Sequence, residues 1–222
     1  MNAPPQTLSQ LQQRVDAIAG KTLGQLAGEL GFKTPQDLLR EKGWVGQLIE
    51  LALGASAGSL PEPDFVSLGV ELKTLPISQK GLPLETTFVS VAPLTNLQGL
   101  TFEQSTVYKK LNHVLWLPIL AERDIAVIDR VIGSGFLWRP NEQQFAQLKR
   151  DWEELTELIA LGKIETLNGH YGDVLQLRPK AANSQALTDA IGPQGKTIQT
   201  LPRGFYLKTH FTKQILANHF GL

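Results

Sequence analysis

The stretch PDFVSLGVELKTL, residues 63–75, indicates both a strand and a chemistry. Residues 70–75 read as a strand, and its two-residue period places Glu71 and Lys73 on one face, with Leu72 on the other. An Asp, a Glu and a Lys are the parts needed to hold a hard divalent cation on carboxylate oxygens and to activate water for phosphodiester hydrolysis. The pattern predicts a metal site if the chain folds Asp64 back beside Glu71.

The same residues have a plainer interpretation, in which Glu71 and Lys73 form an exposed strand pair worth at most ~1 kcal/mol. A Glu/Asp-x-Lys pattern is expected about once by chance in a chain of this size, and it occurs once here. Glu50 is the single acid in the apolar run 44–53, where a charge is costly unless it is paired or near a metal. The pattern alone leaves the metal site and the surface pair equally supported.

Composition narrows the class of protein. The chain has 222 residues, of which 42% are hydrophobic and 19% charged, as in an ordinary globular protein. It has no cysteine, which excludes disulfides, thiolate zinc sites and cysteine nucleophiles. The N-terminal residues lack the apolar core of a signal peptide, and no run approaches membrane-spanning length. We therefore expect a cytoplasmic protein with no membrane partner.

The charge is unevenly distributed. The net charge is zero, but residues 177–222 contain six basic residues and one acid. A basic segment can bind a polyanion within a neutral protein, although most such biases are only solvated surfaces.

The periodicity predicts a mixed α/β fold, because helices and strands do not alternate as regular βαβ units. The expected strands are residues 64–66, 70–75, 86–92, 114–119, 173–177 and 204–208. The expected helices are residues 8–19, 22–30, 34–39, 44–53, 106–113, 141–161, 184–191 and 212–220. The four histidines are scattered, which argues against a zinc site, and no Gly-x-Ser-x-Gly elbow supports a serine hydrolase.

Several longer motifs resemble a known family. They are KGW at 42–44, LGASAGS at 53–59, Asp64 with ELK at 71–73, LETTF at 84–88, LRPKAA at 177–182 and LPRGFYLK at 201–208. Together they closely resemble the MutH family of methyl-directed DNA mismatch-repair endonucleases, in order and over nearly the whole chain. Agreement of several long motifs is far more specific than the catalytic triplet alone.

The resemblance implies an α/β, restriction-endonuclease-like core with a mixed sheet flanked by helices, and two lobes around a DNA cleft. It implies one endonuclease domain over residues 1–222, with a catalytic lobe in about residues 1–105 and a mainly DNA-recognition lobe in about 106–222. The implied activity is a Mg²⁺-dependent nick in the unmethylated strand of hemimethylated GATC sites, 5′ to the G. Mn²⁺ or Ca²⁺ can occupy the same site.

The resemblance also implies roles for individual residues. Asp64, Glu71 and the Leu72 carbonyl would hold the metal, Lys73 would orient or activate the water, and Glu50 would support the metal or its waters. Arg178 matches the base-reading arginine. The other implied DNA contacts are Pro179, Tyr206, Lys42, Gly43 and Phe88, with Lys180 and Lys110 assigned to phosphates.

The implied partners are double-stranded DNA containing GATC, the mismatch-repair ATPase MutL as activator, and the mismatch sensor MutS indirectly. We expect a monomer. Two rivals remain, a GATC restriction endonuclease that cuts both strands and a non-catalytic DNA-binding module. The chain has room for one copy of the catalytic domain, which argues against the first rival, and the intact Asp64, Glu71 and Lys73 argue against the second.

Overall fold

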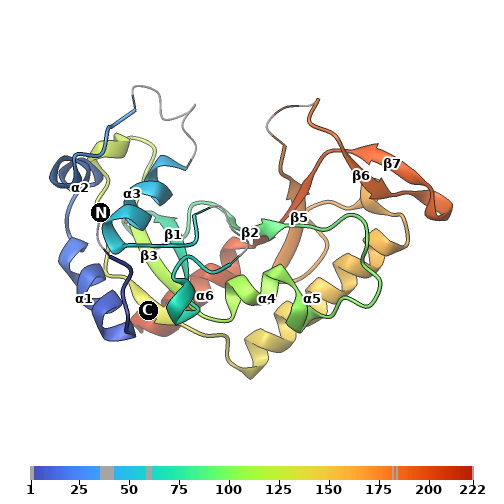
Figure 1. Ribbon diagram of the computed structural model, residues 1–222, viewed down its shortest axis with the longest axis horizontal. Helices are drawn as coiled ribbons and strands as arrows, with labels where there is room; N and C mark the ends of the chain where they lie inside the picture. The colour runs from blue at the N-terminus through green and yellow to red at the C-terminus, as the bar shows by residue number, and fades with distance from the viewer. Residues whose placement is uncertain (1–2, 36–42, 59–61, 182, 184, 222) are drawn as a thin grey trace. The chain divides into compact units, whose positions relative to one another are not determined.

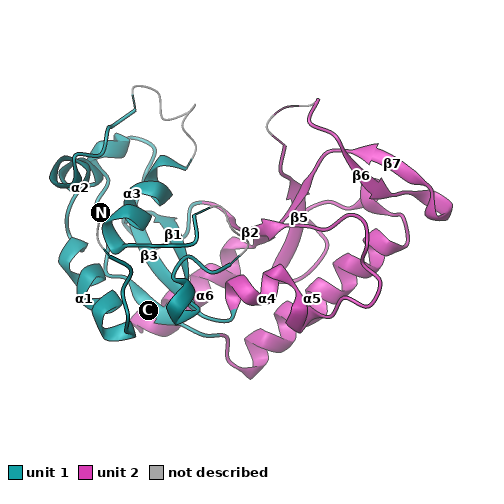
Figure 2. Ribbon diagram, in the orientation of Figure 1, with its two compact units in different colours: residues 1–84, 112–139 teal, residues 85–111, 140–222 magenta. Residues whose placement is uncertain are grey.

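The chain forms two compact units, each built from two segments. The computed structural model describes residues 3–35, 43–58, 62–181, 183 and 185–221. Unit 1 comprises residues 1–84 and 112–139, and unit 2 comprises residues 85–111 and 140–222, as coloured in Figure 2. The chain therefore crosses between the units three times. The expected division of catalysis and recognition near residue 105 concerns function and stays a prediction.

Unit 1 combines helices with a small mixed sheet. Its helices are α1 (Leu8–Ile18), α2 (Leu23–Leu30) and α3 (Trp44–Leu53), and its strands are β1 (Glu71–Ile77), β3 (Val114–Leu120) and β4 (Phe136–Trp138). Figure 1 shows β1 beside β3. The strand order is β1-β3-β4, with β1 parallel and β4 antiparallel to β3. Two of these helices begin at side-chain caps, since Thr7 accepts the Gln10 N–H at the start of α1 and Thr22 accepts the Gln25 N–H at the start of α2.

The core of unit 1 forms between the helices and the sheet. The apolar faces of the three helices pack in one cluster with Val70, Leu72, Leu115 and Leu117. β3 is buried along nearly its whole length, as expected of a central strand covered on both faces. This packing fixes β1 as an edge strand beside a rigid neighbour.

Unit 2 is built on an antiparallel sheet. Its strands β2 (Thr87–Val91), β8 (Arg203–Leu207) and β5 (Leu175–Pro179) lie in the order β2-β8-β5. Its helices are α4 (Thr106–Leu111), α5 (Glu142–Ala160) and α6 (Thr209–Phe220). A separate hairpin pairs β6 (Thr188–Ile191) with β7 (Thr197–Thr200).

Most expected elements are confirmed within a few residues, but two expectations fail. The helix expected at 184–191 is wrong, because Thr188–Ile191 within it pairs as a strand with Thr197–Thr200. Residues 64–66 are not a strand, since Val66–Leu68 forms a short 3-10 helix. The short strands β4 and β7 were not expected. The expected helix at 34–39 falls largely outside the described residues.

The sheets and helices confirm a mixed α/β protein. Within the part of the chain that the structure describes, no helix is long and apolar enough to cross a membrane.

Candidate active site

A tight turn folds Asp64 back onto β1. Phe65 and Val70 form an antiparallel bridge around the 3-10 helix Val66–Leu68, and Gly69 completes the turn with a φ of 61°. The left-handed region favours glycine. Extending this bridge by one residue places Asp64 opposite Glu71. The Asp64 carboxylate accepts the Leu72 N–H with a distance of 2.8 Å to Oδ2, so the fold-back required by the sequence prediction is confirmed.

Glu71 and Lys73 lie on one face of β1, as the strand period predicted. Lys73 Nζ donates to Glu71 Oε1 at 2.6 Å, and the two side chains are only 12% and 3% exposed. The interpretation as an exposed surface pair is therefore wrong. Taking two charges out of water carries a large desolvation penalty that their attraction often does not repay, so stability alone is a weak reason to keep such a pair.

The surroundings of Glu71 are mostly apolar. Val114 and Trp116 of β3 lie beside Glu71 and Lys73 in the parallel register, and both are fully buried. The Glu71 N–H donates to the His113 carbonyl at 2.9 Å. The site is therefore a charged group within a packed sheet.

His113 is an uncharged neighbour of this site. Arg139 Nη2 lies 3.0 Å from His113 Nδ1, and because a guanidinium only donates, Nδ1 accepts and the ring proton is on Nε2. Burial, reinforced by the Arg139 charge, lowers the pKa of His113 below its usual range. Sequence reasoning treated His113 only as one of four scattered histidines.

The donor set fits a hard divalent cation. The Glu71 N–H points toward β3, so the backbone groups of the next residue, Leu72, point away from β3. The Leu72 carbonyl is therefore on the same edge as the Asp64 carboxylate. Two carboxylates and one carbonyl are oxygen ligands of the kind Mg²⁺ takes, with waters completing its shell.

Glu50 does not complete a three-carboxylate cluster. Among the described residues, no three His, Cys, Asp or Glu side chains gather closely enough to hold a metal ion. Glu50 is half-buried on α3, with Oε1 3.8 Å from the position that a Cβ on Gly46 would take. Its expected role in supporting the metal or its waters stays a prediction.

A second group of expected residues lies on one face of the unit 2 sheet. Phe88 pairs with Tyr206 and Ser90 with Phe205, so the register shifts between Phe88 and Ser90. This bulge turns Phe88 to the Tyr206 side and Ser90 to the Phe205 side. We call these the Tyr206 face and the Phe205 face.

The Tyr206 face carries cations on aromatic rings. The Phe88 and Tyr206 rings meet edge to face at 5.3 Å between centroids. The Arg178 guanidinium lies 5.6 Å from the Tyr206 centroid and Lys180 Nζ lies 4.4 Å from the Phe88 centroid. Burial raises the pKa of Tyr206, opposed by the Arg178 charge, so its hydroxyl stays protonated at neutral pH.

Gly204 makes room for these rings. A Cβ on Gly204 would meet Phe88 Cε2 at 2.9 Å and Tyr206 Cε2 at 3.2 Å. Arg178 Nη1 also donates to Thr86 Oγ1 at 2.8 Å. The sequence prediction did not single out Gly204 or Thr86, although both lie inside the motifs that carried the family resemblance.

The remaining expected DNA contacts are dispersed. Pro179 is exposed at the end of β5, and Lys110 is half-buried near the end of α4. Gly43 is the N-cap of α3, with a φ of 108°. Lys42 lies outside the described residues.

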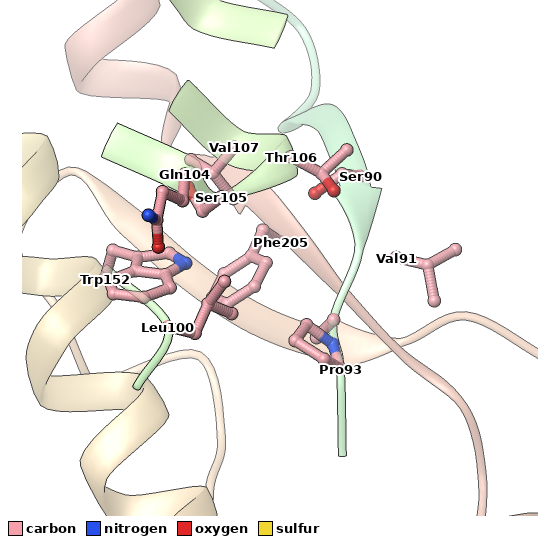
Figure 3. Close-up of a pocket in the computed structure, with 11 residues that line it drawn as sticks. Ser90, Val91, Pro93, Leu100, Gln104, Ser105, Thr106, Val107, Trp152 and Phe205 are labelled. Carbon is pink, nitrogen blue, oxygen red and sulfur yellow. The ribbon is translucent and has the colours of Figure 1, made fainter. Parts of the chain in front are cut away.

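A cavity of about 340 Å³ opens on the Phe205 face, lined among others by Ser90, Trp152 and Phe205. Figure 3 shows Val91 lying apart from the other lining residues. None of the residues that we predict to be catalytic or to bind DNA lines this cavity. It is therefore not the candidate active site.

Fold and site together define a mixed α/β protein with a buried acidic site suited to a hard divalent cation. A family model described as "DNA mismatch repair enzyme MutH" matches residues 53–151, which include Asp64, Glu71 and Lys73. The DNA mismatch repair protein MutH of Shewanella woodyi is 58% identical over 98% of this chain and 94% of its own length. Its counterparts from Yersinia enterocolitica and Klebsiella pneumoniae are 59% and 56% identical, over 99% and 100% of this chain and 96% of each relative. The chain belongs to the MutH family.

Proposed function

We propose that the protein is a metal-dependent DNA endonuclease of mismatch repair, which nicks the unmethylated strand of hemimethylated GATC sites 5′ to the G. The observation that carries the proposal is the buried Glu71–Lys73 pair with Asp64 folded back beside it. Membership of the MutH family supports the repair context.

In this proposal, Asp64, Glu71 and the Leu72 carbonyl hold Mg²⁺, and Mn²⁺ or Ca²⁺ can take its place. A bound Mg²⁺ lowers the pKa of water and neutralises charge that develops on the phosphate. Lys73 orients the attacking water or takes its proton, and Glu50 holds waters around the site. The β1–β3 sheet with its covering helices would be the restriction-endonuclease-like core, and DNA would contact residues of both units.

Sequence reading is assigned to the Tyr206 face. An exposed arginine suits the O6 and N7 acceptors of guanine in the major groove, and Arg178 has that exposure. An N6-methyl group removes one adenine donor hydrogen and adds bulk, so packed rings at Tyr206 and Phe88 can distinguish methylated adenine. Pro179, Gly43 and Lys42 would contact the GATC sequence of the DNA, and Lys180 and Lys110 would bind its phosphates.

The proposed partners are GATC-containing duplex DNA and MutL, with MutS acting through MutL. A weak nickase that waits for an activator avoids damage to the chromosome. We propose that the protein works as a monomer in the cytoplasm.

The test uses plasmids with unmethylated, hemimethylated or fully methylated GATC sites, with Mg²⁺ or EDTA, and with or without MutL. We expect nicks in the unmethylated strand, dependence on Mg²⁺ and stimulation by MutL. Double-strand cutting without MutL would identify a restriction enzyme instead. Binding without any nicking would identify a DNA-binding module.

A further inference from the structure

The Arg178 side chain is held from two sides although it is exposed. Its guanidinium lies against the Tyr206 ring, and its Nη1 donates to Thr86 Oγ1 at 2.8 Å. Thr86 immediately precedes β2, and β8 separates β2 from β5 in the sheet. The hydrogen bond therefore joins residues from opposite sides of β8.

The register places part of this group on one face. Arg178 pairs with Gly204, which lies two residues before Tyr206, and Phe88 pairs with Tyr206, so strand alternation puts Arg178 and both rings on the Tyr206 face. Thr86 lies just outside β2, and its hydroxyl reaches this face through the hydrogen bond to Arg178. Gly204 has no side chain between Arg178 and the two rings, so the arginine can extend toward Tyr206 and Thr86.

Holding an arginine has a physical consequence for base reading. A long arginine side chain loses about 2 kcal/mol of rotamer entropy when it is fixed, and a bidentate contact to guanine requires the guanidinium plane in one orientation. The ring and the hydroxyl fix that plane before DNA arrives. Thr86 uses Nη1 as donor, and a guanidinium has five N–H groups, so donors remain for O6 and N7.

We propose that Thr86 is a positioning residue that holds the Arg178 guanidinium for guanine recognition. This inference rests on the proposed function, because it takes Arg178 as the guanine reader. It also couples the recognition of guanine to the recognition of adenine methylation, because Thr86, Phe88 and Tyr206 share one packed face. A displacement of the Phe88 and Tyr206 rings would therefore also displace the support of Arg178.

The test compares affinities for two hemimethylated duplexes, one with GATC and one in which 7-deazaguanine replaces the guanine and removes its N7 acceptor. Thr86→Val removes the hydroxyl at nearly constant shape, and Thr86→Ser keeps it. Thr87→Val is the matched control, because Thr87 is the next residue, is buried and pairs with Leu207, which places it on the Phe205 face. Arg178→Ala is the reference for complete loss. Equilibrium affinity is measured so that the result does not depend on nicking.

We expect the affinity ratio of the two duplexes to fall about fivefold in Thr86→Val, the loss of one ordinary hydrogen bond. The ratio should stay at the wild-type value in Thr86→Ser and Thr87→Val, with melting temperatures and affinity for unrelated DNA unchanged. If Arg178→Ala lowers the affinity ratio but Thr86→Val keeps the wild-type ratio, the role of Thr86 is overturned and the proposed function still stands. Equal losses in Thr86→Val and Thr87→Val would also overturn it, and an unchanged ratio in Arg178→Ala would overturn both assignments.

Discussion

At the scale of single residues, the Glu71–Lys73 pair sets the chemistry of the site. Its short distance and low exposure mean that the ammonium compensates the charge of the carboxylate within a packed sheet. Because Lys73 bonds Oε1 of Glu71, the carboxylate that is proposed to hold Mg²⁺ also keeps the ammonium beside the proposed cation site.

The first residue-scale prediction concerns Lys73. Lys73→Ala should abolish nicking but leave DNA affinity largely unchanged, because the ammonium is proposed to act on water rather than on the base sequence. Nicking assays and binding titrations on the same duplex check this, with Lys80→Ala, an exposed lysine of the same unit, as control. A variant that still nicks at the wild-type rate removes Lys73 from the mechanism.

The second residue-scale prediction concerns the binding of Mg²⁺. Mg²⁺ should raise the melting temperature of the wild type, since a ligand at 100 times its Kd stabilises the folded state by about 2.7 kcal/mol. The shift should disappear in Glu71→Gln and persist in Asp124→Asn, an exposed control in unit 1. Thermal melts with and without Mg²⁺ measure it. Equal shifts in both variants would place the cation elsewhere.

At the scale of elements, the turn at residues 65–70 determines whether the site exists. The strand gives Glu71 and Lys73 a common face, but only the Phe65–Val70 bridge brings Asp64 to the Leu72 N–H. The turn depends on a glycine in the left-handed region, which costs other residues about 1–2 kcal/mol.

Gly69→Ala should therefore lower the free energy of unfolding by about 1 kcal/mol and weaken nicking by displacing Asp64. Gly28→Ala is the matched control, because Gly28 lies in α2 with nothing within 4 Å of the added Cβ. That control should stabilise the protein by up to about 1 kcal/mol. Urea unfolding of the two variants measures both effects, and a neutral Gly69→Ala would show that the turn tolerates another conformation.

Sequence reasoning succeeded where the signal is local. The helix Trp44–Leu53 has the expected bounds, and the two-residue period correctly paired Glu71 with Lys73. It failed where strand pairing overrides a local pattern: Leu187, Ala190 and Ile191 have helical spacing, but pairing with Thr197–Thr200 makes Thr188–Ile191 a strand. The burial of the ion pair and the bulge at Phe88 depend on neighbours that no local pattern specifies.

At the scale of the whole molecule, the basic C-terminal segment is less uniform than its charge count suggested. Arg178 and Lys180 lie on the Tyr206 face, but Lys208 Nζ donates to the Gly172 carbonyl at 2.6 Å. Lys208 thus holds a loop of unit 2 rather than adding to an open basic surface. The electrostatic contribution to DNA binding should come from part of the segment.

Stability of the whole molecule should fall in mild acid because of His113. Its folded pKa is lowered, so below the ordinary unfolded value of about 6.5 the unfolded state binds a proton that the folded state does not. The contribution of His113 to the free energy of unfolding is present above the unfolded pKa and is lost as the pH falls toward the folded pKa. His113→Gln should reduce the loss between pH 7.5 and 5.5, while the exposed His170→Gln should not; unfolding at both pH values decides.

The chain path, with its three crossings between units, has an evolutionary consequence. Neither unit corresponds to one uninterrupted piece of the gene, so exchange of a single contiguous segment cannot transplant either unit intact. Residues 85–111, which carry Thr86 and Phe88, are encoded between two parts of unit 1. The two units are therefore inherited together, and we expect a change of the proposed target to arise by substitution within this chain.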